Sequence, residues 1–173
     1  MRSRSRRALV LPFALGVLTV APACSDDDLT GITTDPDWVA TPRGFFERPD
    51  PVATDAQGTG FFVDDGETIR FRIDVQEIDD VTLAHIHAGD AETAGPIVVT
   101  LFDAGTEPVS FEERGVLVEG SFGADDLEPG GGIAPLDALV ATIESGTVYV
   151  NVHTTTHPTG EIRAQILRVF PPD

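Results

Sequence analysis

The chain has 173 residues and carries 29 acidic against 11 basic residues, which gives a formal net charge of −18. Such an acidic surface repels nucleic acid and anionic lipid headgroups, so the composition excludes nucleic-acid binding. A single cysteine excludes an internal disulfide, and stability has to come from the packing of apolar side chains.

The first 23 residues have the layout of an export signal. The basic cap MRSRSRR precedes the apolar run ALVLPFALGVLTV, which is shorter than the roughly 20 residues of a membrane-spanning helix. We expect residues 1–23 to be removed, after general secretory or twin-arginine export. This leader holds four of the basic residues and no acidic one, so the remaining chain has 7 basic against 29 acidic residues, a net charge of −22.

Cys24 follows the leader directly. The stretch VAPAC resembles a bacterial lipobox, which implies that Cys24 is acylated and becomes the new N-terminus. The alternative is ordinary cleavage after Ala23, which leaves Cys24 as a free thiol. We favour acylation, because an unpaired exposed cysteine is unusual in an exported protein. The protein is then expected in the cell envelope, touching the membrane only through this anchor, or secreted.

Residues 24–37 are rich in Asp, Thr and Gly and offer few apolar side chains to bury. This composition is typical of flexible linkers, so we expect an acidic tether here. The folded part then runs from about Trp38 to residue 170. No repeat or shift in composition divides it, and we expect a single domain.

The dominant signal in the folded part has a period of two residues. In TIRFRIDV, residues 68–75, apolar and polar side chains alternate, which indicates a strand with one buried face. The run GTGFFV is joined to this strand by DDG, which predicts a hairpin. Further strands are expected at residues 81–87, 96–102, 115–122, 147–153 and 161–170.

One segment follows a different period. In PLDALVATIESG the apolar residues fall at i, i+3, i+4 and i+7, which predicts one short helix near residues 135–144. Pro135 suits its first turn, and Gly146 can end it in a left-handed conformation. Short strands between Gly, Pro and Asp turns, with one helix, are typical of an antiparallel β-sandwich or barrel.

All four histidines lie in two short stretches, AHIH (His85 and His87) and VNVHTTTHP (His153 and His157). Strand alternation places His85 and His87 on the same face. On the later strand the valines form the natural core face. We therefore expect His153, together with Asn151, to face a polar seam or solvent.

Two interpretations of these histidines stay open. Imidazoles at i and i+2 on one strand can reach a single ion, and a third from a neighbouring strand would complete a zinc or copper site. The candidate ligands are His85, His87 and His153, with His157 as a fourth. Alternatively, the rings hydrogen-bond to loop carbonyls and fix strand ends. No residue is predicted to be catalytic, because no nucleophile or carboxylate stands beside them at a diagnostic spacing.

Two stretches, AHIHAGDAETAGPIVVTLF and SGTVYVNVHTTTHPTGEIRAQI, closely resemble the CHRD domain, a family first described in chordin and found in many bacterial exported proteins. With weaker similarity upstream, the resemblance spans Trp38 to Leu167. It implies an immunoglobulin-like antiparallel β-sandwich of about 7 to 9 strands. Its motif includes the polar residues Asn151, Glu161 and Arg163, of which the last two are expected to anchor neighbouring strands or loops. It implies little about function, because the family has no agreed activity.

Two functions from different classes are therefore considered. The first is a non-enzymatic module of the cell envelope, held by an acylated Cys24 and presenting its loops to a protein, glycan or ion. The second is a metalloprotein that binds zinc or copper through the histidines. The sequence does not support an enzyme, because it contains no P-loop, dinucleotide fingerprint, G-x-S-x-G or H-E-x-x-H motif.

Overall fold

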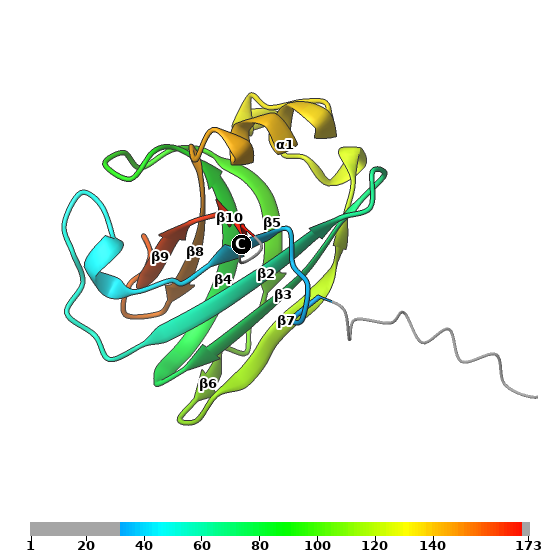
Figure 1. The fold of residues 1–173 in the computed structure, drawn as a ribbon. Helices are drawn as coiled ribbons and strands as arrows, with labels where there is room; N and C mark the ends of the chain where they lie inside the picture. Colours follow the sequence, from blue (N-terminus) through cyan, green and yellow to red (C-terminus); the bar gives the residue numbers. More distant parts are fainter. Residues whose placement is uncertain (1–31, 171–173) are drawn as a thin grey trace, which may run out of the picture.

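A computed structural model describes residues 32–170, so the leader, Cys24 and the first part of the tether lie outside the described residues. In this part of the chain, ten strands form two antiparallel sheets, accompanied by one α-helix (Figure 1). The predicted all-β sandwich with one short helix is confirmed. Three of the ten strands have only two or three residues, too few to show an alternation in the sequence.

The strands divide equally between the two sheets. In spatial order the first sheet contains β10 (Leu167–Arg168), β1 (Trp38–Ala40), β2 (Gln57–Asp64), β3 (Ile69–Gln76) and β7 (Gly115–Phe122). The second contains β5 (Ile97–Asp103), β4 (Ile78–Ala88), β8 (Val148–Thr154) and β9 (Ile162–Gln165), and β6 (Val109–Phe111) also pairs with β4. Among residues 32–170, three short 3-10 helices lie in the loops: η2 (Gly44–Phe46), η3 (Ala124–Asp126) and η4 (Pro129–Gly131).

The predicted hairpin joins β2 to β3. Asp65 stabilises its turn, because one carboxylate oxygen accepts hydrogen bonds from the amides of Glu67 and Thr68. Gly66 takes a φ of 89°, which suits glycine in a tight turn. Along β3 the apolar members of the alternation are buried in the core between the sheets: Ile69, Phe71, Ile73 and Val75.

The helix α1 (Leu136–Glu144) lies at one end of the sandwich (Figure 1). It buries Leu136, Leu139 and Ile143 against the core, as its period predicts. The indole nitrogen of Trp38 donates a hydrogen bond to Glu144, which fastens the helix to β1. None of the described helices has the length and apolar character needed to cross a membrane.

Strand β8 is buried on both of its faces, which its alternation alone does not indicate. Its valines point into the core, while its polar residues lie under loops that cover the outer face of the second sheet. One such loop contains η2, and its Arg43 backbone pairs with Arg163 on β9. Figure 1 shows this segment in cyan beside β9. The polar seam expected at β8 therefore exists, but it is a buried layer and not a surface.

The last part of the expected tether lies against the domain. The side chain of Ile32 is fully buried, and the backbone amide of Asp37 donates a hydrogen bond to Phe62 on β2. The Asp37 carboxylate also accepts a hydrogen bond from the amide of Asp64. Asp37 thus contacts the first sheet, and Ile32 is buried against the domain.

Candidate functional site

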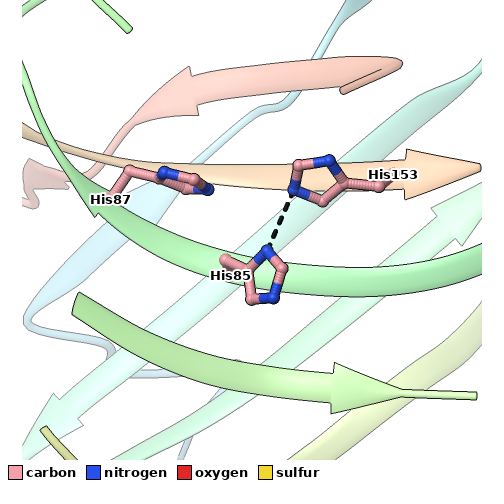
Figure 2. Close-up of side chains that lie close together, drawn as sticks. All are labelled: His85, His87 and His153. Carbon is pink, nitrogen blue, oxygen red and sulfur yellow. Dashed lines mark hydrogen bonds between the residues drawn. The ribbon is translucent and has the colours of Figure 1, made fainter. Parts of the chain in front are cut away.

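Three of the four histidines come together on the outer face of the second sheet. Antiparallel pairing of β4 with β8 sets His85 opposite Asn151 and Leu83 opposite His153, so His85 and His153 are diagonal neighbours. One ring nitrogen from each of His85, His87 and His153 lies within 4.8 Å of the other two. Figure 2 shows the three rings converging from the two strands.

These three rings are almost removed from solvent. The exposed fractions are 5% for His85, 9% for His87 and 6% for His153. Burial lowers the pKa of His85 and of His153 to about 4, and it lowers the pKa of His87 as well. All three imidazoles are therefore neutral at neutral pH, the form in which a ring nitrogen can bind a metal ion.

Backbone carbonyls fix the orientation of two rings. His87 Nδ1 donates to the carbonyl of Gly95 over 2.9 Å, and His153 Nδ1 donates to the carbonyl of Pro158 over 3.2 Å. A carbonyl can only accept, so the proton of each neutral ring is on Nδ1 and each Nε2 carries a bare lone pair. His87 Nε2 is buried and has no hydrogen-bond partner. Such a bond from the far ring nitrogen to a carbonyl is the usual support of a metal-binding histidine.

A stack of three side chains holds His87 from its other side. The Tyr149 ring lies parallel to His87 with 5.0 Å between centroids, and the Arg163 guanidinium lies 3.6 Å from the Tyr149 centroid. The Tyr149 hydroxyl accepts a hydrogen bond from the amide of Gly95, the residue whose carbonyl binds His87. Only glycine fits there, because a Cβ would overlap the carbonyl oxygen of Ala88.

Arg163 and Glu161 each form hydrogen bonds to neighbouring loops. Arg163 donates to the carbonyls of Asp90 and Thr93, which holds the loop before Gly95. Glu161 accepts hydrogen bonds of 2.7 Å from Thr54 and from Thr154, tying the loop before β2 to the end of β8. Neither residue forms a hydrogen bond with Asn151.

Asn151 instead pairs with Glu47, a residue for which the sequence predicted no role. The Asn151 amide donates to the Glu47 carboxyl over 2.8 Å, and the Glu47 side chain is 3% exposed. Burial raises the pKa of Glu47 to about 7. Gly160 lies against both groups, where a Cβ would overlap the Asn151 amide. The only sequence signal was a carboxylate inside a loop rich in Pro and aromatic residues.

His157 lies apart from the other three histidines. It lines a cavity of about 560 Å³ together with Glu161, Asp55 and Asp79, and its backbone amide donates a hydrogen bond to Thr154. The structure therefore brings together three of the four candidate ligands. Within residues 32–170 they form the one group of three or more histidine, cysteine or acidic residues with metal-binding spacing.

The geometry of the three rings fits a small transition-metal ion. Zinc binds imidazole nitrogen at about 2.0 Å, which separates neighbouring ligand nitrogens by roughly 3.3 Å in a tetrahedral site. The closest pair, His85 Nδ1 and His153 Nε2, is 3.0 Å apart, and no pair exceeds 4.8 Å. Small rotations of the rings would thus bring all three into coordination. Three ligands also leave a fourth position for an external group.

Comparison with known proteins identifies the family. No curated protein and no solved structure matches the chain. The sequence model of the CHRD domain matches residues 39–166, which include all strands from β2 to β9 and all four histidines. Because this match covers most of the sequence, the chain belongs to the CHRD domain family.

Proposed function

We propose that this CHRD-domain protein acts outside the cytoplasm and binds one transition-metal ion, zinc or copper, through His85, His87 and His153. The observation that carries the proposal is the convergence of three buried ring nitrogens within 4.8 Å. Two of these nitrogens, Nε2 of His87 and Nε2 of His153, carry bare lone pairs. Backbone carbonyls hold both rings in place through Nδ1. Nitrogen ligands of this type suit zinc and copper, whereas magnesium and calcium prefer oxygen.

A purely structural role for the cluster accounts for less of this geometry. The Nδ1 bonds of His87 and His153 would serve to fix the loops, as the structural interpretation expects. That role gives no partner to His87 Nε2, which is buried and unsatisfied. A buried polar atom without a partner costs about 1 to 3 kcal/mol, so its persistence supports a ligand that occupies the position.

The cellular setting that we propose is the cell envelope. The leader and the lipobox-like VAPAC favour export and acylation of Cys24, both outside the described residues. The acidic chain would attract cations towards its surface. In this setting the domain is a binding module without enzymatic activity, and its ligand is an ion. A protein or glycan partner at the loops is a second expectation that no contact in the structure favours.

Metal content of the purified protein tests the proposal. We expect about one zinc or copper ion per chain by elemental analysis after purification without a metal-binding tag. His85→Ala, His87→Ala and His153→Ala should each lose the ion. The matched control is His157→Ala, which removes the histidine outside the cluster and should keep it. A protein that takes up no ion from micromolar zinc or copper, or equal loss in all four variants, would refute the site.

A further inference from the structure

A hydrogen bond between His85 and His153 closes the histidine cluster. We propose that metal loading breaks this bond by moving the His85 proton, so that His85 binds through Nδ1 while His87 and His153 bind through Nε2. The inference rests on the proposed function, because it assigns the ligand atoms of the same site. It also identifies His85 as the ligand that changes state during loading.

The proton positions follow from the carbonyl bonds. Gly95 and Pro158 accept from Nδ1 of His87 and His153, so neither of these rings has a proton on Nε2. His85 Nδ1 lies 3.0 Å from His153 Nε2. Since His153 Nε2 is a bare acceptor, the hydrogen between the two rings belongs to His85 Nδ1. With these contacts, all three neutral rings carry their proton on Nδ1.

Two of the three rings are already in the form that metal binding requires. Nε2 of His87 points toward the other rings and has no partner, and Nε2 of His153 is engaged only by His85 (Figure 2). Neither ring can present Nδ1 without losing its carbonyl bond. These two histidines should therefore keep their protons in place when the ion arrives.

His85 is held differently. Its Nδ1 faces the other two rings, whereas its second nitrogen points away from them (Figure 2). That second nitrogen, Nε2, has no hydrogen-bond partner within residues 32–170 and is not among their buried unsatisfied atoms, so it reaches solvent. Without rotating the ring, His85 can offer only Nδ1 to an ion, and Nδ1 must first lose its hydrogen.

The exchange is balanced in protons. The Nδ1–H bond of His85 breaks and its proton passes to water, while Nε2 takes a proton from water and remains hydrogen-bonded to solvent. The ion takes the place of the hydrogen between His85 and His153 and also contacts His87 Nε2. The ring stays neutral throughout, and the cluster gains the charge of the ion alone.

Nitrogen-15 NMR of the labelled protein reads the tautomer of each histidine directly. In the metal-free protein we expect the proton on Nδ1 of all three rings. After addition of one equivalent of zinc, which is diamagnetic, His85 should change to the Nε2–H form while His87 and His153 keep Nδ1–H. The His157 signals should not respond and serve as the internal control.

The outcomes of this experiment distinguish a failure of the present inference from a failure of the proposed metal site. If zinc binds and His85 keeps its proton on Nδ1, the ring has turned to coordinate through Nε2, and the present inference is refuted while the metal site stands. A proton shift in His87 or His153 upon loading would refute it equally. If neither zinc nor copper(I), which is also diamagnetic, changes any of the histidine signals, the proposed function itself fails.

Amide substitutions give a second test that needs no NMR. The side-chain oxygen of asparagine can take the place of Nδ1, and that of glutamine reaches the place of Nε2. His85→Asn should therefore retain more zinc affinity than His85→Gln. At His87 the order should be reversed, with His87→Gln retaining more than His87→Asn. The same order at both positions would contradict the mixed ligand set, and circular dichroism would verify that each variant is folded.

Discussion

The substitution Glu47→Gln tests how the buried polar layer is held over the second sheet. The Glu47 side chain is 3% exposed, and burial raises its pKa from 4.5 to about 7. Glutamine has nearly the same shape and can still accept the hydrogen bond from Asn151, but it carries no charge at any pH. The substitution therefore isolates the free-energy cost of burying the carboxylate charge.

Proton binding by Glu47 determines how the contribution of this side chain to the stability of the protein changes with pH. Because the pKa of Glu47 is raised in the folded protein, the folded state holds this proton more tightly than the unfolded chain. The resulting stability is fully present below pH 4.5 and is lost as the pH rises through about 7. The shift from 4.5 to about 7 corresponds to a loss of about 3 kcal/mol. Relative to the wild type, Glu47→Gln should gain up to this amount over the same range.

Urea denaturation at several pH values measures this difference, with fluorescence from the single, buried Trp38. All other ionisable groups are the same in both proteins, so their contribution cancels. The control is Glu92→Gln, because the exposed Glu92 carboxylate pairs with Arg48 at the surface. This substitution should change the free energy of unfolding by less than about 1 kcal/mol. A difference between wild type and Glu47→Gln that stays constant with pH would refute the assignment of a buried, desolvated carboxyl.

Four further predictions concern the core, the metal site and the anchor. Ile73→Ala should lower the free energy of unfolding by about 2 to 5 kcal/mol, because the Ile73 side chain is fully buried. Substitution of the exposed Ser121 by Ala should change it by less than about 0.5 kcal/mol. Equal effects of the two substitutions in urea denaturation would reject the buried face assigned to β3. Tyr149→Phe removes the acceptor that holds Gly95 and should weaken zinc binding about 10- to 100-fold in competition with a chelator. An unchanged affinity would mean that stacking alone orients His87. Zinc at about 100 times its Kd should stabilise the protein by about 2.7 kcal/mol, and a chelator should reverse the shift in Tm; no shift would contradict binding to the folded state. Cys24→Ser should move the protein from the membrane fraction to the soluble fraction, and unchanged fractionation would remove the lipid anchor.

The alternation of the sequence predicted those parts of the structure that depend on a single strand. Side chains two residues apart share a face whatever surrounds the strand, so the core face of β3 and the common face of His85 and His87 were readable directly. The helix was readable for the same reason, because its apolar spacing is local. The sequence left open whether His85 meets His153, and it is the register of β4 with β8 that brings the two rings together.

The parts that were not predictable depend on loops folding back over a sheet. In β8 the alternation of valine with polar residues indicates one exposed face, yet all seven residues are buried. The cover comes from the η2 loop and from the loop before Gly95, whose positions are set by tertiary hydrogen bonds to Asn151, Tyr149 and Arg163. Neither loop has a periodic sequence pattern that would indicate which face of the sheet it covers. For the same reason the sequence did not indicate that Glu47 pairs with Asn151.

The position of His87 is the strongest physical reason to expect a ligand at this cluster. Its Nδ1 bond to Gly95 and its stacking on Tyr149 prevent the ring from turning its free nitrogen toward solvent. That nitrogen is left buried without a partner, at a cost of about 1 to 3 kcal/mol. A leucine at this position would lose the bond to Gly95, but it would leave no buried ring nitrogen without a partner. The fold instead holds a bare lone pair toward two other imidazoles, and a metal ion is the partner that would satisfy all three.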